Sequence, residues 1–151
     1  MVLHGLWPQG ERRTPQWCPS AIRPTPADLR PMMCVTPSAR LLSYEWSKHG
    51  ACMTRQPRGY FRKSRELWGA IRWPDLDRLS RQKPLSAGVL RRALAEANPR
   101  WSANGIGVEL NSRGWLEGVR FCYGLDYRPK ACSRSQLGPA DAARISIWRG
   151  L

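Results

Sequence analysis

Apolar side chains recur at helical spacing in three stretches of the chain, and each stretch predicts an amphipathic helix. The first runs from Ser38, which can cap a helix after a proline, to about His49, where a glycine follows. Within it, Leu41 and Leu42 precede Trp46 by five and four positions, so the three side chains form one inward-facing stripe. This helix is therefore expected to pack one face against a core.

The other two predicted helices are bounded by prolines. One covers residues 58–73 and ends before Pro74, and the other starts at Ser86 and ends before Pro99. Residues 8–37 contain seven prolines at close intervals, which excludes a long helix there. We expect this segment to be an irregular, tethered loop.

The last third of the chain changes to the alternation that is typical of strands. Residues 106–110 and 115–123 predict two strands around an Asn-Ser-Arg-Gly turn, and residues 143–148 predict a further strand. Residues 2–6 read as the end of a buried strand. Helices first and antiparallel strands later predict an α+β fold, with an antiparallel sheet packed against several helices.

Length and charge narrow the class of protein. A chain of 151 residues with 42% hydrophobic residues is long enough for one domain with a core, and no apolar run is long enough to span a membrane. The net charge is +14, and 21 of the 25 cationic side chains are arginine, which suits bidentate phosphate contacts. A polyanionic partner is expected, with nucleic acid first and an anionic surface second.

Cysteine usage points to an oxidising compartment. Five cysteines indicate disulfides, and the odd number leaves one cysteine without an internal partner. The spacing matches no common metal-binding pattern, so no metal or other cofactor is expected. No export signal precedes residues 2–6. The hypothesis that reconciles these observations is an N-terminally shortened chain that lacks a signal peptide and an upstream strand.

The only two histidines lie in two chemically rich segments, HGLWPQG from His4 and SYEWSKHGAC up to Cys52. On a helix, Glu45 lies three positions before Lys48 and four before His49, so the three side chains project from one side. A carboxylate beside an imidazole orients it and raises its pKa. The lysine adds positive charge, which suits a substrate that becomes more negative in its transition state.

The first segment supplies the second imidazole and an aromatic face. Trp7 follows His4 closely and offers a surface on which a nucleobase could stack. If folding brings His4 opposite His49, one imidazole can accept a proton while the other donates one. A phosphodiester with a neighbouring 2′-hydroxyl uses such a pair without a metal, and Lys48 would then stabilise the phosphorane.

Two other interpretations remain open from these residues alone. Glu45 and Lys48 could be an ordinary surface pair, worth about 0.3–0.5 kcal/mol on a helix. His4, Glu45 and His49 could instead ligate zinc and make a zinc hydrolase. Lys48 on the same face disfavours a cation there.

The segments HGLWPQ (residues 4–9) and YEWSKHGAC (residues 44–52) closely resemble the two active-site segments of the ribonuclease T2 family, which read HGLWP and EWxKHGTC. The resemblance implies a T2-like fold and a metal-independent endoribonuclease of a bacterial type. It implies that His49 is the base and His4 the acid, and that Glu45 and Lys48 stabilise the phosphate.

The resemblance also implies roles for neighbouring residues. Trp7 would stack on a substrate base, Tyr44 stands where many members carry a third histidine that assists phosphate binding, and Gln9 stands where many carry Asp or Asn near the base pocket. The implied disulfides join Cys34 to Cys52 and Cys122 to Cys132, which leaves Cys18 as the odd cysteine. Family members normally begin some tens of residues before HGLWP, with a strand that carries a cysteine.

The expected protein is therefore a single catalytic domain over residues 1–151 that cleaves single-stranded RNA to 2′,3′-cyclic phosphates and then to 3′-phosphates. DNA should resist, because the 2′-hydroxyl is the nucleophile. We expect a monomer that is secreted or periplasmic. The alternative is a non-catalytic basic protein of this fold that binds RNA or another polyanion.

Overall fold

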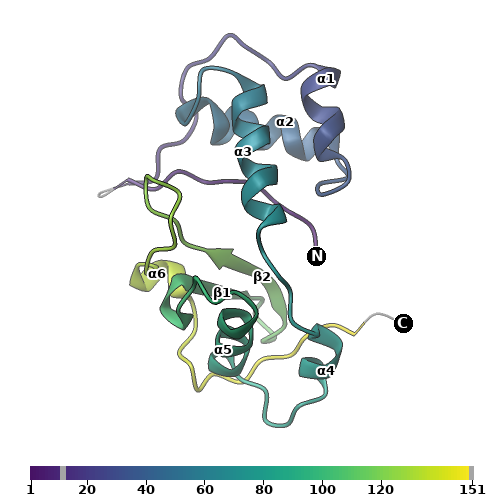
Figure 1. Ribbon diagram of the computed structural model, residues 1–151, viewed down its shortest axis with the longest axis vertical. Helices are drawn as coiled ribbons and strands as arrows, with labels where there is room; N and C mark the ends of the chain where they lie inside the picture. The colour runs from purple at the N-terminus through teal and green to yellow at the C-terminus, as the bar shows by residue number, and fades with distance from the viewer. Residues whose placement is uncertain (11–12, 150–151) are drawn as a thin grey trace. The chain divides into compact units, whose positions relative to one another are not determined.

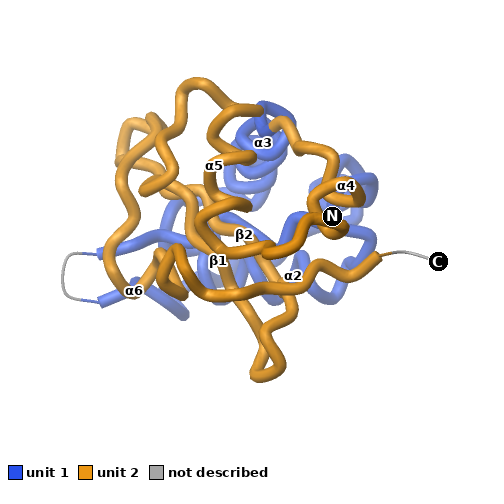
Figure 2. Tube along the Cα trace, turned by 90° about the horizontal axis from the view of Figure 1, so that it is seen from below, with its two compact units in different colours: residues 1–71 blue, residues 72–151 orange. Residues whose placement is uncertain are grey.

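The computed structural model describes residues 1–10 and 13–149. It divides into two compact units, Met1–Ile71 and Arg72–Leu151, which Figure 2 colours separately. The expectation of a single catalytic domain stays a prediction.

The elements of both units are helices and one small sheet (Figure 1). The first unit contains α1 (Pro26–Leu29), η1 (Arg30–Met32), α2 (Ala39–Lys48), η2 (Gly50–Cys52) and α3 (Pro57–Gly69). The second contains α4 (Leu76–Ser80), α5 (Ala87–Ala97), η3 (Ala103–Gly105), β1 (Ile106–Leu110), β2 (Leu116–Phe121) and α6 (Arg134–Leu137). Strands β1 and β2 pair antiparallel, so the predicted α+β class is confirmed.

Helix α2 forms where its apolar stripe predicts it. The Ser38 hydroxyl caps the helix by accepting from the backbone N–H of Leu41 at 3.2 Å. Leu42 and Trp46 are 2% and 1% exposed, and they pack with residues of η1 and α3 in the core of the first unit. The helix therefore presents one face to the core and leaves its polar face for other contacts.

Helix α3 ends four residues earlier than residues 58–73 predicted. The Asn98 side chain accepts from the N–H of Arg72 at 2.8 Å and donates to its carbonyl at 2.7 Å, which holds the backbone there outside a helix. Helix α5 occupies the predicted stretch, with Ser86 as its N-cap. Local apolar spacing thus predicted where both helices lie, whereas the hydrogen bonds of Asn98 to Arg72 determine where α3 ends.

The predicted strand at residues 2–6 is wrong, because the segment has no neighbouring strand. One backbone hydrogen bond joins it to the turn that follows η1, from the N–H of Leu3 to the carbonyl of Val35 at 2.9 Å. The Tyr60 hydroxyl donates to the carbonyl of Leu6 and accepts from its N–H, each at 3.1 Å. A side chain thus satisfies polar groups that a strand would pair with another strand.

The predicted strand at residues 143–148 is also wrong. The N–H of Ile145 donates to Leu85, whereas the N–H of Ser146 donates to Gly114. Because the segment changes partner from one residue to the next, it makes isolated bridges and no continuous ladder. The two strands predicted around residues 111–114 are confirmed as β1 and β2.

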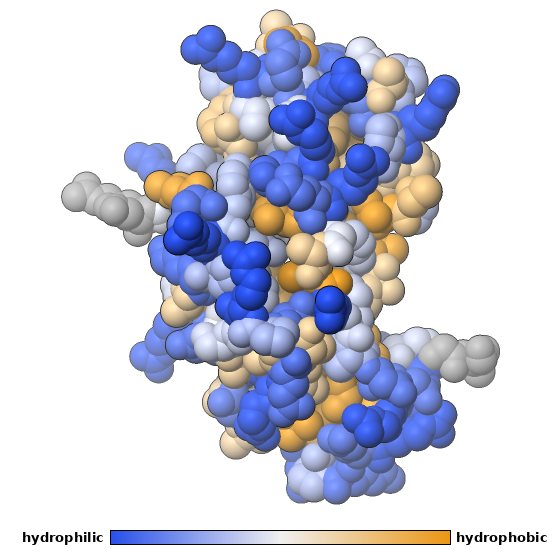
Figure 3. All heavy atoms as spheres, viewed as in Figure 1, coloured by the Kyte–Doolittle hydropathy of each residue, from blue (hydrophilic) through white to orange (hydrophobic). Residues whose placement is uncertain are grey.

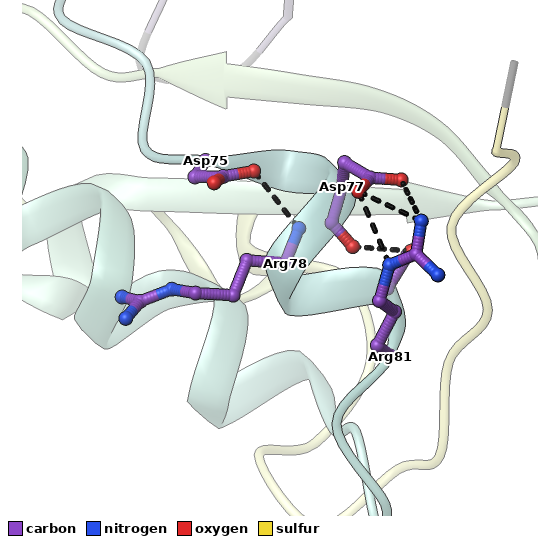
Figure 4. A network of polar contacts seen from close by, with 5 residues as sticks. Asp75, Asp77, Arg78 and Arg81 are labelled. Carbon is purple, nitrogen blue, oxygen red and sulfur yellow. Dashed lines mark hydrogen bonds and ion pairs between the residues drawn. The ribbon is translucent and has the colours of Figure 1, made fainter.

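Three short α-helices, α1, α4 and α6, were not predicted, and each begins with a side-chain capping contact. In the proline-rich segment, Thr25 and Asp28 form a capping box at the start of α1. Asp75 caps α4 by accepting from the N–H of Arg78, and Asp77 pairs with Arg81 one turn later (Figure 4). Residues 8–37 otherwise lack regular structure among the described residues, apart from η1.

Hydrophilic side chains cover most of the face shown in Figure 3, with smaller apolar patches between them. No helix in the described part of the chain has the length and apolar character that a membrane crossing requires.

Candidate active site

The first unit alone carries all the residues that the sequence singled out for catalysis. Helix α2 presents Glu45 and Lys48, and His49 follows directly as its C-cap. Glu45 is 5% exposed and His49 4% exposed, whereas Lys48 is half-buried. Two ionisable side chains are thus held out of water beside a lysine, which is an arrangement that shifts pKa values.

The segment at residues 4–7 lies against Glu45. The indole Nε1–H of Trp7 donates to Glu45 Oε2 at 2.6 Å. Gly5 makes this approach possible, because a side chain there would collide with the carboxylate of Glu45. The glycine of the HGLWP sequence therefore allows close packing of the two segments.

Trp7 also contacts the imidazole of His49. Their ring centroids lie 5.6 Å apart, with 34° between the ring planes. The same indole therefore touches the carboxylate and the imidazole. The sequence predicted that Trp7 stacks on a nucleobase, and the structure shows these two contacts within the protein.

His4 also lies beside Glu45. His4, Gly5 and Glu45 line one small cavity, and the positive charge of His4 lowers the pKa of Glu45. His4 itself is exposed. The described residues thus bring His4, Glu45, Lys48 and His49 into one neighbourhood, with Trp7 between the carboxylate and the buried imidazole.

Burial controls the electrostatics of the two covered groups. Loss of solvent raises the pKa of Glu45 above its ordinary value, against the opposing effects of the Trp7 hydrogen bond and the charges of His4 and Lys48. Loss of solvent, followed by the charge of Lys48, lowers the pKa of His49 below 6.5. The expectation that Glu45 raises the pKa of this imidazole is therefore wrong, because burial and the lysine outweigh it.

His49 keeps one ring nitrogen without a partner. Its Nδ1 is buried and makes no hydrogen bond to the described residues. With its pKa lowered, the ring is neutral at near-neutral pH and can accept a proton. A neutral imidazole beside a lysine is the state that a general base requires.

Tyr44 and an unpredicted tryptophan form an exposed aromatic edge next to Lys48. The Lys48 ammonium lies 5.3 Å from the Tyr44 ring centroid, and Trp17 meets that ring edge-on at 5.6 Å. Trp17 is 56% exposed, and its backbone N–H donates to the carbonyl of Lys48 at 2.9 Å. Nothing in the proline-rich sequence around Trp17 signals this position.

Gln9 is also exposed. Its Oε1 accepts a hydrogen bond from the Thr14 hydroxyl at 3.1 Å. Its assignment to the base pocket stays a prediction.

The predicted bridge between Cys34 and Cys52 is wrong. Cys18 pairs with Cys52, with 5.1 Å between their Cα atoms, and Cys34 is free and exposed. The backbone hydrogen bond from Trp17 to Lys48 holds the proline-rich loop at the end of α2, so Cys18 lies beside Cys52. The second predicted bridge, Cys122–Cys132, is confirmed.

The alternative zinc site is not formed. Across residues 1–10 and 13–149, no three or more side chains of His, Cys, Asp or Glu gather closely enough to hold a metal ion. His4, Glu45 and His49 therefore do not make the ligand set that the zinc hydrolase interpretation requires.

Two curated proteins are similar to parts of this chain. A protein named probable ribonuclease from Haemophilus influenzae is 34% identical over 88 residues, which cover 54% of this chain and 32% of the relative. A protein named ribonuclease from Aeromonas hydrophila is 45% identical over 51 residues, covering 34% of this chain and 23% of the relative. The chain thus spans a third or less of the length of these relatives. No protein-family model matches the chain.

Two solved structures share the fold over nearly the whole chain. RNase NT in complex with 5′-AMP superposes with a TM-score of 0.70 at 20% identity, covering 97% of this chain and 81% of that one. Trichomaglin, an S-like ribonuclease, gives a TM-score of 0.69 at 18% identity, covering 96% and 79%. The resemblance to ribonucleases of the T2 family and the T2-like fold are therefore confirmed.

Proposed function

We propose that this chain is an endoribonuclease of the T2 type that cleaves single-stranded RNA without a metal ion. The observation that carries the proposal is the contact of Trp7 with both Glu45 and His49, which joins the two sequence segments in one site beside Lys48. The similarity to proteins named ribonuclease supports the same reaction class.

In the first step, neutral His49 accepts the proton of the 2′-hydroxyl as that oxygen attacks the adjacent phosphorus. The bond from phosphorus to the 5′-oxygen breaks, and His4 gives its proton to the leaving oxygen. The products are a 2′,3′-cyclic phosphate and a new 5′-hydroxyl. In the second step water attacks the cyclic phosphate with the histidine roles reversed, which leaves a 3′-phosphate.

Lys48 and Glu45 act on the phosphate oxygens. The lysine offsets the negative charge that develops on the phosphorane. Glu45, whose pKa burial raises, keeps its proton to higher pH than an exposed carboxyl and can donate a hydrogen bond to a phosphoryl oxygen. A desolvated site strengthens both interactions.

The partners and location follow from the same chemistry. DNA lacks the attacking 2′-hydroxyl and should resist cleavage. Two disulfides fit a secreted or periplasmic protein. A monomer suffices, because the first unit supplies every proposed catalytic side chain.

The test is an RNA turnover assay in EDTA with identification of the product ends. We expect cyclic-phosphate ends, and we expect His4→Ala and His49→Ala each to cost at least about 10²–10³-fold in rate. Glu66→Gln and Lys63→Ala, at an exposed and a half-buried position of α3, are matched controls for Glu45→Gln and Lys48→Ala and should keep wild-type rates.

Three outcomes would overturn the proposal. Loss of activity in EDTA would point to metal chemistry, and cleavage that survives both histidine substitutions would remove the acid–base pair. RNA binding without cleavage by the wild-type chain would favour the non-catalytic alternative.

A further inference from the structure

The second unit contains a cavity that the proposed reaction does not use. It measures about 720 Å³, which lies within the range of small-molecule sites. Its walls come from residues 80 and 82–85, from Trp115 just before β2 and from residues 144–149. All of these belong to the unit that carries none of the proposed catalytic residues.

Two tryptophans dominate the apolar part of the wall. Trp115 and Trp148 have ring centroids 5.7 Å apart, with 56° between the ring planes. Trp148 is 74% exposed, although a large apolar ring is usually covered in a folded protein. An exposed indole beside a second one offers flat faces on which a nucleobase can stack.

The polar part of the wall is cationic. Lys83, Arg144 and Arg149 line the cavity, and none of its described lining residues is acidic. None of the three cations forms an ion pair with another side chain in residues 1–10 or 13–149. They are therefore available to contact phosphate groups.

Backbone hydrogen bonds fix the wall in place. The N–H of Leu116 donates to Ser146 at 2.8 Å, and the N–H of Ser146 donates to Gly114 at 2.9 Å. On the other side, the N–H of Ile145 donates to Leu85 at 3.1 Å. Since residues 144–146 are held between two segments, Trp115 and Arg144 are positioned before any ligand arrives, which reduces the entropy cost of binding.

We propose that this cavity binds a nucleotide of single-stranded RNA, as a second site for a nucleotide other than the two that flank the scissile phosphate. The ligand class rests on the proposed function, and the site itself rests on the paired indoles and the unpaired cations. Base stacking together with phosphate contacts is how proteins hold single strands without sequence preference. An acidic peptide or an anionic lipid would use the cations and leave the indoles without a planar partner.

Binding is tested with a fluorescein-labelled 12-nucleotide 2′-O-methyl oligoribonucleotide, which cannot be cleaved because its 2′-oxygens are blocked. We expect Trp148→Ala and the double variant Lys83→Ala/Arg144→Ala each to weaken binding about tenfold in fluorescence anisotropy. Leu125→Ala and Arg128→Ala change exposed positions of the same unit outside the cavity, and they should bind within about twofold of wild type.

Cleavage kinetics separate this site from the active site. Trp148→Ala should raise KM for a 12-nucleotide RNA and leave kcat/KM for a dinucleoside monophosphate unchanged, because both nucleosides of the shorter substrate flank the scissile phosphate and none is left for a second site. Weaker oligonucleotide binding by Trp148→Ala in a protein that cleaves nothing would support this site and refute only the nuclease.

Unchanged oligonucleotide affinity in both cavity variants would overturn the proposal. Equal competition by polyaspartate or by phosphatidylglycerol vesicles would also overturn it, because the cavity would then bind anions without regard to bases.

Discussion

Trp7 contacts both buried ionisable residues of the candidate active site, through its Nε1–H to Glu45 and its ring to His49. The hydrogen bond holds the carboxylate oxygen, and the ring covers one side of the imidazole. Through these two contacts Trp7 acts as a positioning residue, in addition to any stacking on a nucleobase. The two roles differ in what they require of the indole nitrogen.

Trp7→Phe separates the two roles. Phenylalanine keeps an aromatic face for His49 and for a base, and it removes the donor to Glu45, so the pKa of Glu45 should rise further. We expect kcat/KM to fall by up to about tenfold, since a hydrogen bond is worth about 0.5–1.5 kcal/mol. The change should show in steady-state kinetics, together with an altered pH profile.

The matched control for this change is Trp17→Phe, on an exposed indole that meets Tyr44. It should leave the pH profile in place. A Trp7→Phe enzyme with wild-type kcat/KM and an unshifted profile would mean that base stacking is the whole role of Trp7.

The pH dependence of His49 has a definite sign. Because burial and Lys48 lower its pKa in the folded state, the unfolded chain binds the proton first as pH falls below about 6.5. The stability cost of His49 therefore grows as pH falls from about 6.5 to its lower folded pKa, and it persists below that pKa. The same shift keeps the proposed base neutral in mild acid, so the acid limb of kcat/KM should lie below pH 6.5.

The raised pKa of Glu45 acts in the opposite sense. Stability from its protonated form is present below the unfolded pKa near 4.5 and is lost as pH rises through the folded pKa.

The prediction for His49 is measured by NMR. Titration of the two imidazole signals, assigned with His4→Ala, gives the folded pKa of His49 directly. A value at or above 6.5 would contradict the burial argument.

At the scale of elements, local apolar spacing predicted the three longest helices, and partners distant in sequence determined the rest. Residues 2–6 carry a strand-like pattern, but the Tyr60 hydroxyl takes the place of a neighbouring strand. The short helices α1 and α4 depend on caps at Thr25 and Asp75, which are too brief a signal to separate from a turn. The apolar pattern of a segment does not show which distant residue will hydrogen-bond to it.

The disulfide error belongs to the same scale and yields a test. Cys18–Cys52 closes a loop with a sequence separation of 34, for which loop entropy predicts a loss of roughly 3–4 kcal/mol in the double variant Cys18→Ser/Cys52→Ser. Cys34→Ser should change the free energy of unfolding by less than about 0.5 kcal/mol, because Cys34 is exposed and free. Urea denaturation measures both.

A peptide map of the unreduced protein identifies the bridge independently. A Cys18–Cys52 peptide is expected. A Cys34–Cys52 peptide, together with large destabilisation by Cys34→Ser, would restore the pairing that the family resemblance implied.

For the molecule as a whole, the two motifs predicted which residues meet in the first unit, and burial determined how they behave. Sequence spacing placed Glu45, Lys48 and His49 on one side of a helix, and the resemblance joined them to His4. The lowered pKa of His49 and the two contacts of Trp7 depend on side chains packed around them. A short sequence motif does not show how side chains will pack around its residues, so it did not predict these properties.

The net charge of +14 makes a prediction at this largest scale. Cationic side chains release counterions when they contact phosphates, so affinity for the uncleavable oligonucleotide should fall at least about tenfold between 50 and 200 mM salt. Anisotropy titrations at several salt concentrations give the slope. Affinity that does not change with salt would show that the excess of arginine does not serve RNA binding.

The Tyr60 hydroxyl has a consequence beyond the segment it bonds. It grips the peptide immediately before the indole that adjoins the proposed base, and it projects from a helix that supplies no reacting group. The phenol of Tyr60 on α3 thus holds the backbone of Leu6 in place. A shift of that helix would move Leu6 and, with it, the neighbouring Trp7 that contacts Glu45 and His49.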